Sequence, residues 1–235
     1  MFDLMDGIIF YVVFLLSTTL HEAAHAWAAL KGGDSTAYDG GQVTLNPLPH
    51  IKREPVGMVL LPLISVVVAG WPLGFASAPY NRRWAEQFPD RAAWMALAGP
   101  GANLLLVLLA ALLINVGVLA DVFFAPDTIN FADVTAAAAG EGSWWGSIGY
   151  LLGSFFAMNL LLFIFNLLPL PPLDGSAAIT LLLPDHLVPR YQNFIWSHPQ
   201  FALLGIIVAW KIFDLVFHPL FTIAISWLYP GVSYS

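Results

Sequence analysis

Long, nearly uncharged runs of apolar residues are the feature that most limits what this chain can fold into. Four runs are long enough to cross a bilayer as helices, which takes about 20 residues each. They cover roughly residues 4–30, 92–124, 145–168 and 199–229. Of all 235 residues, 59% are hydrophobic and 10% are charged, whereas a soluble domain carries about a quarter charged residues. The sequence therefore predicts an integral membrane protein and excludes an ordinary water-soluble domain.

Three features refine this architecture. Residues 57–78 are apolar but contain two prolines and three glycines, which suits a bent or re-entrant segment better than a straight span. Residues 40–45, GGQVTL, have strand-like composition after a diglycine turn. Pro219 is expected to break the last helix. We predict an all-α polytopic membrane protein with about four to six transmembrane helices, a re-entrant segment and a small membrane-associated β-hairpin, folded as one domain over residues 1–235.

Charge placement predicts the orientation of the chain. Residues 121–143 contain four acids and no basic residue, whereas six of the eight basic residues lie between the spans at 4–30 and 92–124. These six are Lys31, Lys52, Arg53, Arg82, Arg83 and Arg91. Because basic loops stay in the cytoplasm, residues 31–91 are expected to face inward and 121–143 outward. A re-entrant 57–78 segment explains this most simply; the alternative is an ordinary crossing with an imperfect charge bias.

Composition also excludes several classes of function. The formal net charge is −7, from 8 basic and 15 acidic residues, so no nucleic-acid partner is expected. The chain has no cysteine, which excludes disulfides, thiolate metal sites and a cysteine nucleophile. Asp3 and Asp6 open the first apolar segment instead of basic residues, so we expect no cleavable signal peptide. The oligomeric state is left open.

The first apolar segment carries the motif His21-Glu22-Ala23-Ala24-His25. Residues four apart share a helix face, so both imidazoles can bind one metal ion, for which Zn²⁺ is the best match. Glu22 then lies close enough to take a proton from a metal-bound water. A chance HExxH on a helix surface is the alternative. That alternative is weakened because ionisable side chains inside an apolar helix are costly and usually functional.

A third metal ligand must come from another segment. Asp174 is the preferred candidate, because prolines stop the third span just before it and Gly175 permits a sharp turn after it. If residues 57–78 are re-entrant, the third span ends on the cytoplasmic side and Asp174 meets His21 and His25 at a similar depth. The other histidines lie near segment ends and are expected to be interfacial or solvated: His50, His186, His198 and His218.

The order of these motifs resembles that of the site-2 proteases, which are intramembrane zinc metalloproteases. The resemblance rests on the HExxH motif and on NLLPLPPLDG at 166–175, with LNPLPHI at 45–51 and AGPGAN at 98–103 between them. It covers about residues 15–180. It implies that His21, His25 and Asp174 ligate one Zn²⁺, and that Glu22 is the catalytic base for hydrolysis of a peptide bond within or near a substrate's transmembrane helix.

The resemblance also implies roles for residues outside the metal site. Asn166 would orient the substrate or stabilise an oxyanion, although a simple helix-to-helix hydrogen bond fits equally well. The latter interpretation is favoured for Asn103 and Asn159. GGQVTL resembles the family's membrane-embedded sheet, whose free edge could pair with an unwound substrate; a plain connecting hairpin is the alternative.

The chain departs from better-known members of this family. We expect no spanning segment before the HExxH helix and no PDZ or CBS-like domain. Residues 70–81 resemble a compact prokaryotic branch, except that Ser77 stands where a basic residue is expected. We therefore predict a compact protease of a prokaryotic inner (plasma) membrane, with its active site toward the cytoplasm and a transmembrane protein in the lipid bilayer as substrate.

Two other functions remain open at this stage. One is a non-catalytic metal-binding membrane protein, such as a transporter or an inactive protease relative. Transport would favour ionisable residues along one path through several helices, whereas here they concentrate at one site. Lys211 and Asp214 are the main exceptions, and they are spaced to pair with each other. The other is a zinc hydrolase acting on something other than a peptide.

Overall fold

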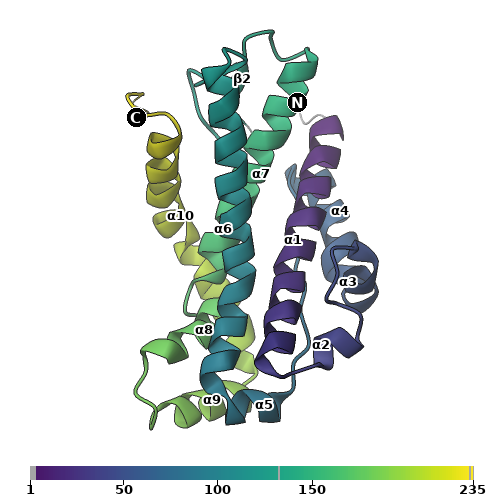
Figure 1. Ribbon diagram of the computed structural model, residues 1–235, viewed down its shortest axis with the longest axis vertical. Coiled ribbons are helices and arrows are strands. Elements are labelled where there is room, and N and C mark those ends of the chain that lie inside the picture. The colour runs from purple at the N-terminus through teal and green to yellow at the C-terminus, as the bar shows by residue number, and fades with distance from the viewer. Residues whose placement is uncertain (1–3, 132, 233, 235) are drawn as a thin grey trace.

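Four long helices dominate the structure, a computed structural model that describes residues 4–131, 133–232 and 234 (Figure 1). They are α1 (Leu4–Gly32), α6 (Pro89–Leu119), α7 (Trp144–Asn166) and α10 (Gln200–Leu228). Each is long and apolar enough to cross a membrane. The predicted all-α polytopic membrane fold is thereby confirmed.

Shorter elements connect these helices. Thr36–Asp39 (α2), Pro47–Arg53 (α3), the π-helix Val56–Leu60 and Leu61–Ala69 (α4) lie between α1 and α6, followed by Arg82–Gln87 (α5). Strands β1 (Phe123–Phe124) and β2 (Ala136–Ala137) pair antiparallel between α6 and α7. Asp174–Ala178 (α8), a 3₁₀ turn Ile179–Leu182 and Val188–Ser197 (α9) lie between α7 and α10.

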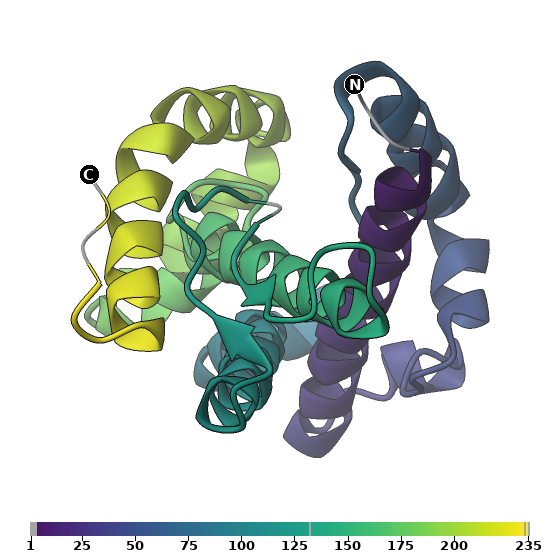
Figure 2. The same ribbon diagram turned by 90° about the horizontal axis from the view of Figure 1, so that it is seen from above.

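The helices α1, α6 and α7 pack against one another, and α10 packs against α7. Figure 1 shows the start of α1, the β1–β2 pair and the end of α10 at one end of the molecule, with α2, α5 and α9 at the other. Since the four long helices alternate in direction, they bring the chain back to the end at which α1 starts. Figure 2 shows α10 on one side of α7 and α1 on the other.

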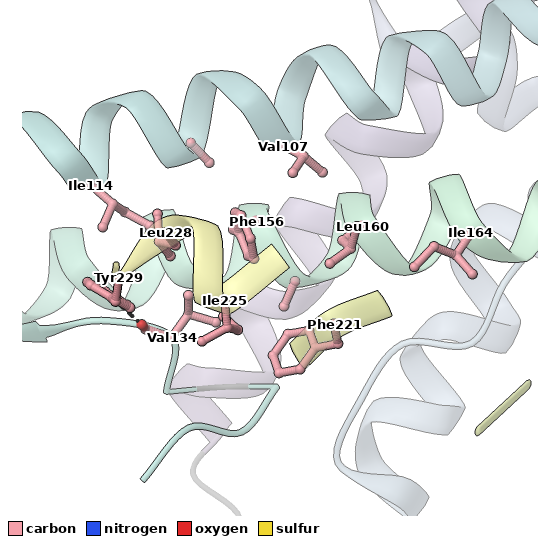
Figure 3. Packing of buried hydrophobic residues seen from close by; sticks show 12 residues of the cluster. Val107, Ile114, Val134, Phe156, Leu160, Ile164, Phe221, Ile225, Leu228 and Tyr229 are labelled. Carbon is pink, nitrogen blue, oxygen red and sulfur yellow. Dashed lines mark hydrogen bonds between the residues drawn. The ribbon is translucent and has the colours of Figure 1, made fainter. Parts of the chain in front are cut away.

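A hydrophobic cluster joins α6, α7 and α10 near the β1–β2 end (Figure 3). Ile114 of α6, Phe156 of α7 and Ile225 of α10 are each at most 2% exposed. The Tyr229 hydroxyl donates a hydrogen bond to the Val134 carbonyl at 3.0 Å, which ties the end of α10 to the loop before β2. Burial raises the pKa of Tyr229 to about 12, so the phenol remains a donor.

The segment between α1 and α6 leaves one end of the molecule and returns to it. Its return is fixed where Asn81 N–H donates to Asp34 Oδ2 at 2.7 Å and Trp84 Nε1–H donates to the Gly32 carbonyl at 3.0 Å. Between these points the chain runs beside α1, where the Tyr11 hydroxyl donates to the Met58 carbonyl at 3.2 Å. This path confirms the prediction that residues 57–78 are re-entrant, and it contradicts the alternative of an ordinary crossing.

Three local predictions were wrong. Residues 40–45 form no strand: the Gln42 amide closes the α2 turn on the Ala37 carbonyl, and the Thr44 carbonyl accepts from His50 Nε2 instead of from a partner strand. The small sheet lies between α6 and α7, at the opposite end of the molecule (Figure 1).

The second span was predicted to reach residue 124 but stops at Leu119. It stops there because Asp121 takes a left-handed φ of 56° and the Val122 amide bonds back to the helix.

The last helix is also not broken at Pro219. The helix assignment continues from Gln200 to Leu228 with Pro219 inside it. Figure 2 shows that the axis of α10 changes direction along its length. Proline removes one helical hydrogen bond and crowds the preceding turn, which bends a helix without ending it when neighbouring turns stay paired.

Candidate metal centre

Three predicted ligands from two distant segments meet at one point. The Nε2 atoms of His21 and His25 are 2.9 Å apart on α1. Asp174 Oδ2 lies 3.1 Å from His21 Nε2 and 3.3 Å from His25 Nε2. One ligand atom from each residue lies within 4.8 Å of those from the other two. The two imidazoles are almost fully buried, and the Asp174 side chain is 21% exposed.

The chain reaches this point because α7 stops abruptly. After Asn166 a proline-rich turn folds back, and α8 begins at Asp174. Gly175 is required there, because a Cβ at this position would overlap with the Leu167 carbonyl of the preceding turn. On the other side of this turn, Gly205 of α10 packs directly on the Pro171 carbonyl, where a Cβ would also overlap.

The second nitrogen of each imidazole is held by a hydrogen-bond acceptor. His21 Nδ1 lies 2.6 Å from Asn103 Oδ1, and His25 Nδ1 lies 2.7 Å from the Met95 carbonyl. Both Nδ1 atoms therefore act as donors, and both Nε2 lone pairs point into the cluster. Two such lone pairs at 2.9 Å repel each other unless a cation lies between them, so this donor set fits a bound metal ion.

Asn103 belongs to a buried polar chain that links three helices. Its amide Nδ2 donates to Asn159 Oδ1 at 2.9 Å, and Asn159 Nδ2 donates to Ser17 Oγ at 2.9 Å. Ser17, Asn103 and Asn159 are all 0% exposed. The predicted helix-to-helix role of both asparagines is confirmed. Sequence reasoning missed the further contact with His21, although a buried amide in an apolar helix was a signal for it.

Gly99 of α6 forms the floor beneath both imidazoles. A Cβ at this position would overlap with Nε2 of His21 and Nε2 of His25. The close approach of α6 to the HExxH helix therefore depends on this glycine. The motif at residues 98–103 contained it, but its spacing alone does not indicate which glycine faces the metal site.

Glu22 is buried beside these ligands, 4% exposed, and its Oε2 has no hydrogen-bond partner within the described residues. Burial opposes ionisation of Asp174, but the adjacent His25 and His21 lower the pKa of its carboxyl below the ordinary value. Asp174 is thus held as a carboxylate, the form that ligates metal ions.

The remaining candidates lie elsewhere. Asn166 Nδ2 donates to the Leu162 carbonyl of its own helix at 3.0 Å, so the described contacts include no helix-to-helix bond for it. His50 is 1% exposed and bonds to the Thr44 carbonyl, so its prediction as an interfacial or solvated histidine was wrong. It is buried because α3 folds back onto the segment after α2. His186 and His218 are exposed and His198 is partly exposed, as expected.

Comparisons with known proteins agree with this arrangement. A sequence model of peptidase family M50 matches residues 9–206. The chain is 30% identical to the protein named Putative zinc metalloprotease YwhC of Bacillus subtilis (strain 168), over 89% of this chain and 92% of that one.

A second relative is the protein named Putative zinc metalloprotease Rip2 of Mycolicibacterium smegmatis (strain ATCC 700084 / mc(2)155). It is 30% identical over 83% of this chain, which spans 63% of the length of Rip2. The Rip2 protein of Mycobacterium tuberculosis (strain ATCC 25618 / H37Rv) matches over the same shares. No solved structure matches the chain significantly.

Proposed function

The chain belongs to peptidase family M50, the site-2 protease family, and we propose that it hydrolyses a peptide bond within or near a transmembrane segment of a membrane protein. One observation carries this proposal: a His–His–Asp cluster fit for a metal lies buried inside a bundle of membrane-spanning helices. A substrate for a site at that depth must itself enter the bilayer. The family and the names of the relatives imply zinc, which suits this donor set.

His21, His25 and Asp174 would hold the zinc ion through Nε2, Nε2 and Oδ2. When bound, zinc supplies Lewis-acid activation of water and of the scissile carbonyl. Glu22 is proposed as the base that takes the proton from the attacking water and passes it to the leaving amine. Its buried Oε2, without a partner among the described residues, is free to accept that proton. Asn103 and the Met95 carbonyl keep both imidazoles in the ligating tautomer.

Asn166 remains a candidate for orienting the substrate or stabilising the oxyanion. Its amide lies at the last turn of α7, eight residues before Asp174, and it is partly exposed. In this role Asn166 Nδ2 would exchange its bond to the Leu162 carbonyl for a bond to the substrate carbonyl.

A groove beside the HExxH helix is the proposed path of the substrate backbone. A cavity of about 340 Å³ has Leu20, Ala23 and Trp27 of α1 on one side and residues 43–45 on the other. Residues 43–45 pair with no strand in the described structure. The Thr44 carbonyl accepts from His50 Nε2, but the peptide groups of Val43 and Leu45 have no backbone partner in the described structure and are available to an extended peptide. Strand addition there would hold an unwound substrate beside Glu22 through main-chain hydrogen bonds.

The charge distribution supports an orientation with the metal site toward the cytoplasm of a prokaryotic cell. Lys31 and Arg91 lie at the end of the bundle with α2, α5 and α9, the end nearer His25, whereas the acidic loop 121–143 lies at the other (Figure 1). By the positive-inside rule the former end faces the cytoplasm, and the plasma membrane is the expected location.

Metal content and cleavage, measured side by side, test the proposal. Purified wild-type protein should contain about one zinc per chain and cleave a single-span reporter protein in vesicles. His21→Ala and Asp174→Ala should lose both, whereas Glu22→Gln should keep its zinc and lose cleavage. Normal cleavage by Glu22→Gln would refute the mechanism. Zinc without any cleavage of diverse reporters would favour the non-catalytic metal-binding alternative.

A further inference from the structure

A second cavity, of about 590 Å³, lies between α10 and the rest of the bundle. None of the three predicted metal ligands lines it. Its walls come from α1, α7, α10, the re-entrant segment and the loop after β1. Six of its nine lining residues are aromatic: Phe10, Trp71, Phe131, Trp210, Phe213 and Phe217.

The aromatic rings form a nearly continuous wall. The Trp71 ring of the re-entrant segment stacks against Trp210 of α10, with centroids 6.2 Å apart and planes 28° apart. Trp71 also meets Phe131 edge-on at 6.2 Å, and Phe131 lies 5.9 Å from Phe10. The cavity is therefore bounded by aromatic rings that come from four separate parts of the chain.

Asp214 of α10 is the one charged residue that lines this cavity. It is exposed and forms no ion pair or hydrogen bond with the described part of the chain. The predicted pairing with Lys211 is not formed; Lys211 is exposed and does not line the cavity. Asp214 stands at the middle of α10, about 20 Å from either helix end, where an ionised carboxylate needs a partner.

A carboxylate in a cavity lined by aromatic rings is the chemistry that binds an organic cation. Ring faces attract ammonium and guanidinium groups, most strongly where water is scarce, and the carboxylate supplies the opposite charge. Lipid headgroups lie at the bilayer surfaces, so a cation at the depth of Asp214 must come from a membrane-spanning segment. Building on the proposed function, we propose that this cavity binds a basic side chain of the substrate's transmembrane segment, with Asp214 as its counter-ion.

The position of the cavity predicts where that basic residue lies in the substrate. Phe10 precedes His21 by 11 residues on α1, which places the cavity about 16 Å from the metal site toward the acidic-loop end. A helical substrate covers this distance in about 11 residues and an extended one in about five. The basic residue should therefore lie between about five and 11 residues from the scissile bond, on the side facing the acidic loop.

Binding without cleavage tests this inference. In a Glu22→Gln background, Leu161→Cys introduces one cysteine into the cavity wall of a chain that has none. The probes are two synthetic single-span leucine–alanine peptides with one cysteine each, which differ by Lys or Leu at the neighbouring position. Disulfide crosslinking is titrated in phosphatidylglycerol vesicles. The Lys peptide should half-saturate at about tenfold lower concentration than the Leu peptide.

Variants of Asp214 test whether its carboxylate causes the preference for the Lys peptide. Asp214→Asn should abolish the preference, and Asp214→Lys should transfer it to a peptide with Glu at the same position. Lys211→Leu, one turn away but outside the cavity wall, should leave the preference intact. Zinc content at the level of the Glu22→Gln parent shows that each variant is folded.

Two results would overturn the inference. One is equal crosslinking of the Lys and Leu peptides to the parent protein. The other is loss of the Lys preference when phosphatidylcholine is added, since the cavity would then take a lipid cation. Crosslinking needs no cleavage, so it separates the two proposals. A charge preference in a protein that cleaves nothing would refute the proposed protease function and leave this inference standing. Cleavage by the protein with Glu22 intact, without any charge preference, would refute this inference alone.

Discussion

The HExxH helix and the last helix use polar residues in opposite ways. In α1, 56% of the most apolar stretch is buried, and the Nδ1 atoms of His21 and His25 each have a hydrogen-bond acceptor. In α10 only 11% of the corresponding stretch is buried, and Asp214 has no partner in the described chain. The ligands of a metal site must be held in place before the metal ion binds. A surface that binds substrates must instead keep its polar groups free.

The largest effect is expected from filling the floor of the metal site. Gly99→Ala should reduce zinc affinity by about 100-fold or more, because the new Cβ would overlap with both imidazoles. Zinc competition titrations would measure this. Gly101→Ala, two residues along the same helix with nothing within 4 Å of its Cβ, is the matched control. Equal zinc affinities in the two variants would show that the metal site tolerates the added methyl group. The contrast between a preorganised metal site and α10 would then fail.

Removing the acceptor for His21 should have the next largest effect. Asn103→Ala leaves Nδ1 of His21 without its acceptor and frees the ring, so zinc affinity should fall by about 10- to 100-fold. The d–d spectrum of the cobalt-substituted protein should change with it. Asn115→Ala removes an amide that bonds only within the same helix and should change neither. An unaltered cobalt spectrum in Asn103→Ala would mean that Asn103 only joins helices.

A smaller effect is expected where α10 touches the loop that leads to Asp174. Gly205→Ala adds a methyl group against the Pro171 carbonyl, which should destabilise the fold by about 1–3 kcal/mol through overpacking. Zinc affinity should fall a few-fold, since the displaced turn carries Asp174. Leu203→Ala, at a 66% exposed position on the same helix, serves as the control in denaturant titrations. If Gly205→Ala unfolds like the control, α10 does not support the ligand loop.

The smallest effect is expected from one hydroxyl at the end of the bundle nearer the metal site. The Tyr191 hydroxyl of α9 donates to the Ser176 carbonyl of α8 at 2.7 Å. Tyr191→Phe should cost about 1 kcal/mol of folding free energy and should leave the charge preference at Asp214 unchanged. A shift in that preference would mean that the two regions are coupled.

Much of this architecture could be predicted because it depends on patterns within one segment. The four spans follow from apolar length, and the His21–His25 pair follows from helical spacing. Asp174 could be reached because prolines and a glycine mark an abrupt helix end. The re-entrant segment could be inferred from charge placement. Each of these signals is carried by residue types at known separations.

The remainder depends on partners that the sequence does not identify. The hydrogen bond of His25 goes to the Met95 carbonyl, and a backbone carbonyl has no residue-type signature. Residues 40–45 have strand composition, but a strand requires a neighbour, and α2 and His50 take their hydrogen-bonding groups instead. The bend of α10 depends on whether turns around Pro219 stay paired. Such outcomes are decided by packing between segments.

The hydrogen bonds that fix both ends of the re-entrant segment have a consequence for how the sequence can change in evolution. Asp34 and Gly32 meet Asn81 and Trp84 at one place, so residues 35–80 form a closed excursion whose entrance and exit coincide. Insertions or exchanges within the excursion leave the direction in which α6 enters the bilayer unaltered. The sequence of residues 35–80 can therefore diversify as a unit while the metal-binding helices keep their topology.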